Sequence, residues 1–343
     1  GKMRKVTISE VAARAGVSRA TADRVLNRRG GVSVDKERAV LVSARRLGLD
    51  RNLTVAPVQQ LRVCVLMKPP QNPFYERLAR GFRDANLLFN GQAITAYINH
   101  IDVLAPDTIH ARLRKIAKSY DALVIVAPAR DSIIAALRDI AARIPVITLA
   151  TDLPLDTAHY YVGPSNYQAG RLAGELMGRM LGAAGGELLL VAGLREFSGH
   201  EERKRGFRDV LAEDFPACSV AVEIENFDQS GVAADGVAAA LAKQRQIRGI
   251  YNISQGNDEI AQRLKQRKRR RDFFFICHDL TQTTKALLLS REIDVVIDQD
   301  PGLEARRAME IVLRHYGRLD GSPVDGSTPL RVFFRENVAQ EAP

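Results

Sequence analysis

The chain has 343 residues, of which 46% are hydrophobic and 26% are charged, as is ordinary for a globular protein. No apolar run approaches the ~20 residues that a membrane helix needs, and no apolar signal segment opens the chain, so we expect neither a membrane nor a secreted protein. Cys64, Cys218 and Cys277 are far apart. They are expected to be buried thiols in a reducing cytoplasm, with no metal site and no cofactor.

Positive charge is concentrated at the amino-terminal end of the chain. Residues 1–52 contain 13 Lys and Arg against 5 Asp and Glu, whereas the other 291 residues contain 37 against 35. The basic segment also has apolar periodicity, which a solvated tail would lack. This pattern is typical of a small folded domain that binds nucleic acid, attached to a nearly neutral body.

Two short helices are predicted within this segment. Ile8, Val11, Ala12 and Ala15 have the spacing of one helix face, and Gly16 ends that helix because glycine enters the left-handed region without steric cost. A second helix follows at once. The arrangement is that of a helix-turn-helix, whose second helix reads base edges in the major groove of DNA.

Ser18 is expected to cap the second helix, with Ala22, Val25 and Leu26 facing inward. Arginine suits bidentate contacts to guanine, and alanine can contact a thymine methyl group. The residues predicted to contact DNA are Thr7, Ser18, Arg19, Ala20, Thr21, Arg24 and Asn27. A third helix, residues 34–47, is expected to close the small core with Val40, Leu41 and Ala44.

The stretches TISEVAARAGVSRATADRVLN and VSVDKERAVLVSARRLGLDRN resemble the head of the LacI/GalR (lactose-repressor) family of bacterial transcription factors. The resemblance implies a helix-turn-helix domain at residues 1–52, a hinge at 53–61, and an effector-binding and dimerisation core at 62–343. It implies a transcriptional repressor that binds a pseudo-palindromic operator in double-stranded DNA as a homodimer.

Two details depart from the family pattern. Asp23 stands where the family has a serine that contacts phosphate, and we expect it to hold Arg19 one turn back or to accept from a cytosine amine. Pro57 lies in the short hinge sequence LTVAPVQQ, and proline disfavours the hinge helix that the family inserts into the minor groove.

From Leu61 onward, apolar β-type runs alternate with amphipathic helical runs, which predicts an α/β fold with buried parallel sheets. The length favours two lobes. The expected strands are residues 61–68, 94–100, 121–128, 145–150, 187–193, 220–227, 249–254, 273–279 and 294–298. The expected helices include 74–89, 108–120 and 131–144.

The family resemblance extends to this core, including the stretch VGPSNYQAGRLAGELM, and implies two doubly wound, Rossmann-like lobes of the periplasmic-binding-protein type. Three crossings between the lobes are expected near residues 161–163, near 295–299 and within 319–326. The expected extents are about 62–161 plus 298–320 for lobe one and about 163–296 plus 325–343 for lobe two.

Polar residues at the carboxyl ends of the expected strands predict a small-molecule site between the lobes. The candidate effector-binding residues are Asn72, Phe74, Arg130, Asp152, Arg203, Asn257, Asp279 and Gln299. By the family resemblance, Arg203, Asn257, Asp279 and Gln299 match effector-binding positions. Any single aspartate in this set is equally well explained as a helix N-cap.

Amide, carboxylate and guanidinium groups beside an aromatic wall suit a polyhydroxyl ligand, because each hydroxyl both donates and accepts. A sugar or polyol is therefore the predicted effector. A purine is the alternative, although the chain has no Trp, and only Phe74 and Tyr75 stand out as aromatics at the first strand end.

We find no nucleophile elbow, Walker loop, dinucleotide fingerprint or zinc-protease motif, so we do not expect an enzyme. Paired carboxylates of the glycosidase kind remain compatible with the sequence. The basic run KQRKRRR, residues 265–271, is interpreted as a solvated helix end. The alternatives to a sugar-controlled repressor are a regulator of the same architecture that responds to another metabolite, and a small-molecule binding protein without a regulatory role.

Overall fold

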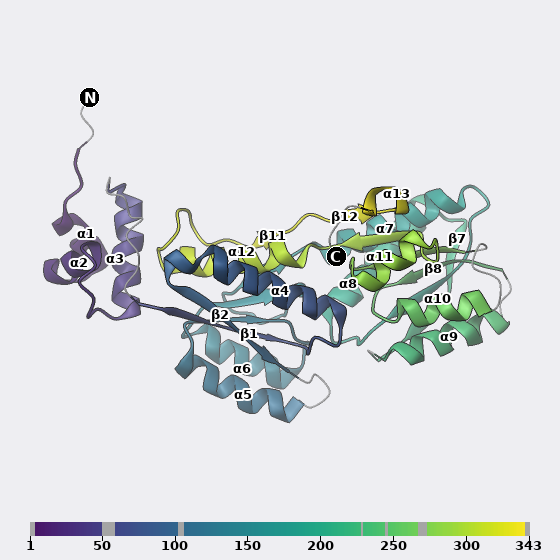
Figure 1. The fold of residues 1–343 in the computed structure, drawn as a ribbon, viewed down its shortest axis with the longest axis horizontal. Helices are drawn as coiled ribbons and strands as arrows, with labels where there is room; N and C mark the ends of the chain where they lie inside the picture. The colour runs from purple at the N-terminus through teal and green to yellow at the C-terminus, as the bar shows by residue number, and fades with distance from the viewer. Residues whose placement is uncertain are drawn as a thin grey trace.

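The structure is a computed structural model that describes residues 4–49, 59–101, 106–227, 229–243, 246–266 and 273–339. Three bodies follow one another along the long axis of the molecule: a helical head and two α/β lobes (Figure 1). Most of the predicted hinge and most of the KQRKRRR run lie outside the described residues. No helix in the described part of the chain is long and apolar enough to cross a membrane.

The head consists of three helices, α1 (Ile8–Ala15), α2 (Arg19–Leu26) and α3 (Val34–Leu47). Gly16 ends α1 in the left-handed conformation, with a φ of 67°. Ser18 caps α2 by accepting from the Thr21 amide. The predicted helix-turn-helix is therefore confirmed. The apolar core of the head is formed by Val11, Ala12, Ala22, Leu26, Val40, Ala44 and Leu49.

Lobe one is a six-stranded sheet in the order β11-β5-β4-β3-β1-β2, and every neighbouring pair is parallel. Its strands are β1 (Leu61–Met67), β2 (Ile94–His100), β3 (Ala122–Ile125), β4 (Val146–Leu149), β5 (Tyr160–Gly163) and β11 (Gly326–Ser327). Its helices are α4 (Pro73–Leu88), α5 (Pro106–Ser119), α6 (Asp131–Ala141) and α12 (Pro301–His315), with a short 3-10 turn at Asn90–Gln92. Helices α4 and α12 cover one face of the sheet, and α5 and α6 cover the other (Figure 1).

Lobe two is a second six-stranded sheet in the order β12-β10-β9-β8-β6-β7, in which only β12 runs antiparallel to its neighbour. Its strands are β6 (Gly186–Ala192), β7 (Cys218–Glu225), β8 (Ile247–Asn252), β9 (Phe274–His278), β10 (Val295–Asp298) and β12 (Arg331–Phe333). One face is covered by α7 (Asn166–Leu181) and α8 (Ser198–Asp214). The other is covered by α9 (Ser230–Lys243), α10 (Asn257–Gln266), α11 (Gln282–Leu289) and α13 (Arg335–Val338).

The chain crosses between the lobes three times. The first crossing follows β5 and the second follows β10, near the positions that the sequence indicated. The third crossing lies at residues 328–330, later than expected, because Gly326 and Ser327 still pair with β5 in lobe one. Two doubly wound lobes, each completed by a segment from the far end of the chain, therefore form the predicted α/β core.

One helix differs from the expectation in the direction that its side chains face. Val40 and Ala44 of α3 pack into the head, as predicted, but Leu41 does not belong to that core. Instead, Leu41 lies against Gly317, at the end of α12 in lobe one. The reason is that α3 is covered on two sides, by the head and by lobe one, which local spacing alone does not show.

Candidate functional site

A cleft of ≈ 280 Å³ lies between the lobes, where strands of both sheets end. Lobe one contributes the loop from β1 to α4 and the ends of β3 and β4. Lobe two contributes the first turns of α8, α10 and α11 and the loops before them. Six of the eight residues predicted for the effector line this cleft, namely Asn72, Phe74, Arg203, Asn257, Asp279 and Gln299.

The other two predicted residues are not among those that line the cleft. Asp152 accepts hydrogen bonds from the Thr148 hydroxyl, the Leu153 amide and the His159 ring, at 2.7–2.9 Å, so it braces the loop after β4. Arg130 occupies the residue before α6, where its amide donates to Pro128 O. Both residues follow strands, as predicted, but neither is among the residues that line the cleft.

Arg203 is the buried cation of the cleft. It lies in the first turns of α8, is 6% exposed, and donates from Nε to Asn166 Oδ1 at 3.0 Å and from Nη1 to Ile253 O at 3.3 Å. Asn166 in turn donates to Ala150 O of lobe one at 2.9 Å. These bonds fix the guanidinium before any ligand arrives. Sequence reasoning missed Asn166, although it directly follows the first crossing.

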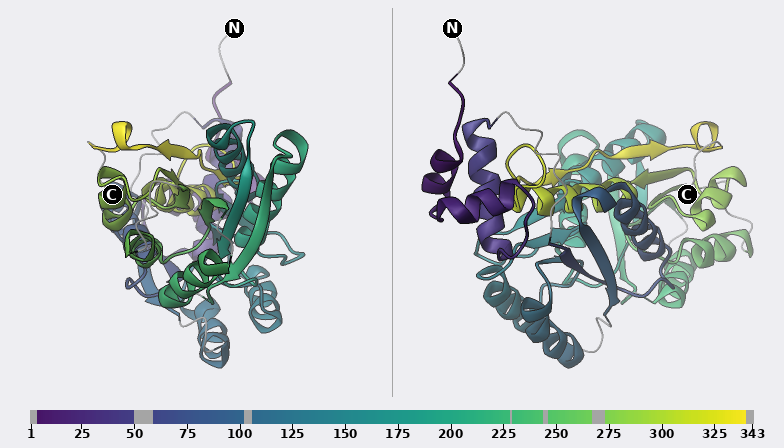
Figure 2. Two further views of the ribbon diagram at one scale, coloured as in Figure 1. Left: turned by 90° about the vertical axis from the view of Figure 1, so that its right-hand side faces the viewer. Right: turned by 60° about the vertical axis from the view of Figure 1, so that its left-hand side comes forward.

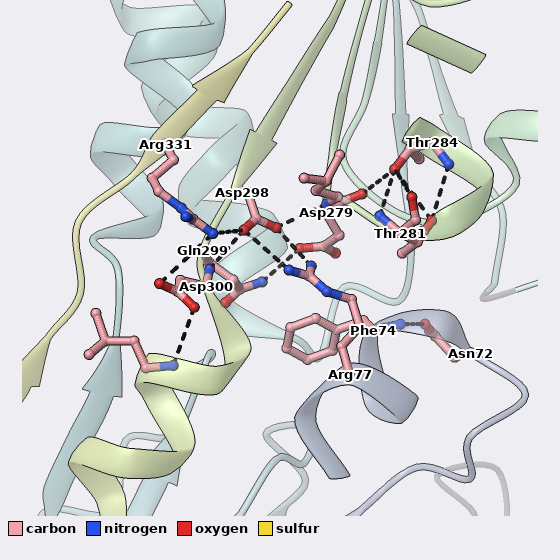
Figure 3. Close-up of polar contacts among 12 residues, drawn as sticks. Asn72, Phe74, Arg77, Asp279, Thr281, Thr284, Asp298, Gln299, Asp300 and Arg331 are labelled. Carbon is pink, nitrogen blue, oxygen red and sulfur yellow. Dashed lines mark hydrogen bonds and ion pairs between the residues drawn. The ribbon is translucent and has the colours of Figure 1, made fainter. Parts of the chain in front are cut away.

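Asp279 and Gln299 form a second polar group. Gln299 Nε2 donates to Asp279 Oδ1 at 3.0 Å, and Gln299 Oε1 is buried without a hydrogen-bond partner among the described residues (Figure 3). Burial raises the pKa of Asp279, although the nearby Arg203 charge and the Gln299 bond oppose that rise. Asp279 also adopts a φ of 72°, which is strained for a residue other than glycine. Gln299 Oε1 is therefore an acceptor that no described residue of the protein uses.

Lobe one supplies the apolar wall of the cleft. The Phe74 and Tyr75 rings lie 5.1 Å apart at 79°, and both rings belong to the core of that lobe. Asn72 lines the cleft but uses Oδ1 to cap α4, accepting from the Phe74 amide at 3.1 Å. Phe197 of lobe two also lines the cleft, with the Lys68 amine 5.2 Å from its ring centre. Sequence reasoning missed Phe197, because no strand-end pattern marks it.

The two lobes touch along the rim of the cleft. The Ala129 amide of lobe one donates to Glu196 O of lobe two at 2.7 Å, and the Thr151 and Ser198 hydroxyl oxygens lie 3.1 Å apart. Leu194 and Phe197, in the loop between β6 and α8, pack into an apolar cluster of lobe one. The lobes therefore contact each other directly beside the cleft.

A buried ion cluster lies beside the cleft, where the second crossing begins. Asp298 has no exposed surface and pairs with Arg77 of lobe one at 2.8 Å and with Arg331 of β12 at 3.1 Å (Figure 3). Burial favours a higher pKa for Asp298, but the Arg77 bond and charge, the Leu280 amide and Arg331 outweigh it and lower the pKa. This cluster joins the two lobes at the second crossing.

Glu304, one turn into α12, is the contrasting group. It is fully buried, and neither carboxyl oxygen has a hydrogen-bond partner among the described residues. Burial raises the pKa of Glu304 well above its usual value, and the carboxylates of Asp279 and Asp298 raise it further. The surroundings of Glu304 therefore favour its uncharged form.

In the head, the predicted DNA-contacting residues lie on and beside α2. Thr7 caps α1 and Ser18 caps α2. The Ser18 hydroxyl accepts from the Thr21 amide and lies 2.9 Å from the Thr21 hydroxyl. Arg19 and Ala20 are exposed. Arg24 is exposed but its Nε donates to Gly30 O at 3.0 Å, which fixes the side chain against the following loop.

The prediction that Asp23 holds Arg19 is wrong. Asp23 accepts from Asn27 Nδ2 at 2.7 Å and pairs with Arg29 at 3.0 Å. These partners lie one turn ahead of Asp23 and beyond the end of α2, rather than one turn back. Arg19 is consequently not tied down by Asp23.

Family comparisons match the two parts of the chain separately. Residues 7–52 match the family model described as bacterial regulatory proteins of the LacI family, and residues 63–319 match that of the periplasmic binding protein domain. Both families consist of proteins that are not enzymes. No curated protein sequence matches the chain significantly.

Several solved structures share the fold of the core. A solute-binding protein of an ABC transporter from Burkholderia graminis, in complex with D-arabinose, has a TM-score of 0.76 at 21% identity, covering 83% of this chain and 99% of its own. GanP, a glucose-galactose binding protein from Geobacillus stearothermophilus, has 0.73 at 20%, covering 82% and 99%. A protein described as a LacI transcriptional regulator from Bacteroides fragilis has 0.71 at 18%, covering 83% and 100%.

A helix-turn-helix head joined to a two-lobed ligand-binding core defines a DNA-binding transcriptional regulator controlled by a small molecule. The chain belongs to the LacI family of bacterial regulatory proteins, and its effector core is a periplasmic binding protein domain.

Proposed function

We propose that this protein is a repressor that acts as a cytoplasmic homodimer without enzymatic activity, and that a neutral sugar or polyol in the cleft sets its affinity for operator DNA. The observation that carries the effector class is the pairing of prearranged polar groups with an apolar wall. Arg203 and the Asp279–Gln299 pair are held by protein bonds on one side, and Phe74 and Tyr75 lie on the other.

The geometry of the aromatic rings favours a polyol over a purine. A planar base binds best between parallel aromatic faces, whereas Phe74 and Tyr75 stand at 79° to each other and both are anchored in lobe one. A sugar needs only one apolar face together with groups that accept and donate around its edge. The Gln299 oxygen without a partner would accept from such a hydroxyl.

A ligand that lacks the matching hydroxyls would leave this buried oxygen unpaired, which disfavours it strongly. The structures in complex with D-arabinose and described as binding glucose and galactose support the same class, on the level of a shared fold. They do not distinguish one sugar from another.

Titration calorimetry and thermal unfolding with D-arabinose, D-glucose, D-galactose, sorbitol, adenine and hypoxanthine test the effector class. We expect one of the polyhydroxyl ligands to bind and both purines to be silent. Arg203→Ala and Asp279→Ala should abolish that binding while operator binding without effector persists. Arg130→Ala, outside the cleft lining, is the control and should bind normally. A purine that binds tightly while every sugar is silent would refute the polyol assignment.

Exposed apolar side chains support the homodimer. Leu87 and Leu88, in the last turn of α4, are 74% and 58% exposed, and Tyr97 projects from the edge strand β2. Two adjacent exposed leucines of this kind mark a surface that another protein covers. We expect Leu87→Glu to shift sedimentation from dimer to monomer, whereas Met180→Glu, at a 55% exposed position of α7, should leave it unchanged. A wild-type monomer at micromolar concentration would contradict the proposal.

The remaining part of the proposal concerns operator reading by α2. Arg19 and Ala20 are exposed at its first turn, and Arg24 is prearranged by its bond to Gly30 O. We expect Arg24→Ala to relax specificity and to cost about 1–3 kcal/mol at one base pair. Binding to a set of single-base operator variants measures this. Equal weakening on all sequences would identify Arg24 as a phosphate contact instead.

A further inference from the structure

Helix α3 of the head has two covered faces. Its residues Val40 and Ala44 pack inside the head. A second row, spaced as one helix face, contacts lobe one and consists of Val34, Glu37, Arg38, Leu41 and Arg45. Figure 1 shows α3 between lobe one and the other two head helices, and Figure 2 shows the same end of the molecule from other sides. The head thus rests on lobe one along the length of α3. We call this contact surface, between α3 and residues 315–318 of lobe one, the seat.

The seat lies at the carboxyl-terminal end of α12. Arg38 Nε donates to His315 O at 2.6 Å, and Arg45 Nε donates to Gly317 O at 2.7 Å. The last carbonyl groups of a helix lack partners within the helix and carry its negative dipole end, so cations are favoured there. Two arginines of the head therefore complete the end of a lobe-one helix.

A buried ion pair lies at the centre of the seat. Arg318 Nη2 is 3.0 Å from Glu37 Oε1, and the two side chains are only 1% and 9% exposed. Arg318 Nη1 is fixed from the lobe side by the carbonyl groups of Gln92 and Ala93, each at 3.1 Å. A pair shielded from water on both sides demands close fit, because a buried charge left alone is costly.

Gly317 shows how close the two bodies approach. Its φ is 73°, and a Cβ at this position would lie 2.7 Å from Leu41 Cβ and 2.8 Å from the Val42 amide nitrogen. No larger residue fits without separating α3 from the lobe. Gly182 offers a matched comparison, since it has a φ of 67° and nothing within 4 Å of the same position.

The opposite end of α12 lies at the effector cleft. Gln299 lines the cleft, Asp300 caps α12, and the helix then runs through 15 residues, about 22 Å, to the seat. We propose that the head is carried as a rigid extension of lobe one, and that α12 and this seat transmit the arrangement of the lobes to the DNA-reading helix. This inference rests on the effector-controlled regulation proposed above.

The seat leaves the reading surface free, because Arg19 and Ala20 on α2 are exposed in the seated head. It therefore orients the head rather than blocking it. It also bears on Pro57, which disfavours a helix in the predicted hinge. The seat is a connection between head and core that needs no hinge helix.

Backbone amide relaxation in the full-length protein tests whether the head is seated. We expect the amides of α1–α3 to relax at the rate of the core. In Gly317→Ala they should relax as a small independent domain, whereas Gly182→Ala, which also replaces a glycine of positive φ but meets nothing within 4 Å, should behave as wild type. Leu41→Glu introduces the disruption from the head side and leaves lobe one intact. Independent tumbling of the wild-type head, or unchanged relaxation in both Gly317→Ala and Leu41→Glu, would overturn the seat.

A lobe-locking disulfide tests transmission without any effector. The Thr151 and Ser198 hydroxyl oxygens are 3.1 Å apart across the lobes, and the three native cysteines are buried. We expect Thr151→Cys/Ser198→Cys, oxidised and reduced, to differ about fivefold or more in affinity for a duplex that the wild-type protein selects from random DNA. In the Leu41→Glu background that ratio should fall to about one.

Two results would overturn the transmission step: no difference between the oxidised and reduced forms, or the same ratio in the Leu41→Glu background. The outcome is separable from that of the effector proposal. Suppose that no sugar binds, and that oxidising the Thr151→Cys/Ser198→Cys disulfide changes operator affinity in the otherwise wild-type protein but not in the Leu41→Glu background. That result would refute the effector class and support the seat.

Discussion

The two ends of α12 both bury ionisable groups, but in different settings. At the cleft end, Asp298 is enclosed by two arginines, and Glu304 is enclosed with no partner among the described residues. At the head end, Glu37 and Arg318 are also buried, but the surface that buries them belongs to two bodies joined by a linker. A charge that loses its partner between the two lobes stays buried, because three chain crossings hold the lobes together, whereas one at the seat can regain water if the head separates from lobe one. Substitutions at the two ends should therefore have different effects.

The largest effect is expected for Asp298→Asn at the cleft end. It leaves Arg77, which is 10% exposed, without its carboxylate, and removing one member of a buried pair costs about 3–5 kcal/mol. Urea unfolding followed by circular dichroism measures the loss. Glu310→Gln, which removes a more exposed carboxylate from α12, is the control and should cost under about 0.5 kcal/mol. Similar losses of unfolding free energy for Asp298→Asn and Glu310→Gln would show that the buried pair contributes no more than an exposed one.

Glu304→Gln should stabilise the protein, with a gain that depends on pH. Burial raises the folded-state pKa of Glu304 above 4.5, its ordinary value, so the folded protein holds this proton more tightly than the unfolded chain does. Stability contributed by the group is complete below pH 4.5 and falls as pH rises towards the folded pKa. Glutamine does not ionise, so the variant should gain almost nothing at pH 4.5 and progressively more as the pH rises to 7.5, by about 1.4 kcal/mol for each pH unit that lies below the raised folded-state pKa.

Urea unfolding at these two pH values measures the Glu304 effect. The charges around Glu304 predict the same sign, because Asp279, Asp298 and Asp300 oppose its ionisation and only Arg203 favours it. A gain that is equal at both pH values would show that the folded-state pKa of Glu304 is not raised above that of the unfolded chain.

The smallest effect on stability is expected for Glu37→Gln at the head end. Arg318 keeps the carbonyl groups of Gln92 and Ala93, and it can regain water when the head leaves, so unfolding of the lobes should change by less than about 1 kcal/mol. Differential scanning calorimetry of the full chain measures this. A loss of about 3 kcal/mol or more would place the seat inside the core and remove the distinction between the two ends.

Local sequence signals were sufficient for much of the fold. Gly16 and Ser18 mark the helix-turn-helix because the φ of one and the hydroxyl of the other act within a few residues. Strands β1–β4 and β6–β10 were predicted because buried parallel strands are continuously apolar. Arg203 and Asp279 line the cleft because parallel strands and the helices that follow them meet at one edge.

What the sequence did not reveal depends on contacts between distant segments. Leu41 turns towards Gly317, and Phe197 enters the apolar cluster of the other lobe, although neither has a neighbour in sequence that indicates this. The third crossing was placed too early because the two-residue strand β11 is too short to produce an apolar pattern. Asp152 had the same strand-end signal as Asp279, but its carboxylate accepts from Thr148, Leu153 and His159 instead of lining the cleft.

The seat joins residues that are made at opposite times. Arg38 and His315 are 277 positions apart, so at about 5–20 residues per second a ribosome finishes the head roughly 15–55 s before it makes the surface on which the head rests. During that interval the head has its own apolar core and can fold, but the lobe-one surface that it contacts has not yet been synthesised. A chain that ends before residue 315 would likewise carry an intact DNA-reading unit with no seat. Premature termination should therefore yield products that bind DNA and whose DNA affinity does not depend on the effector cleft.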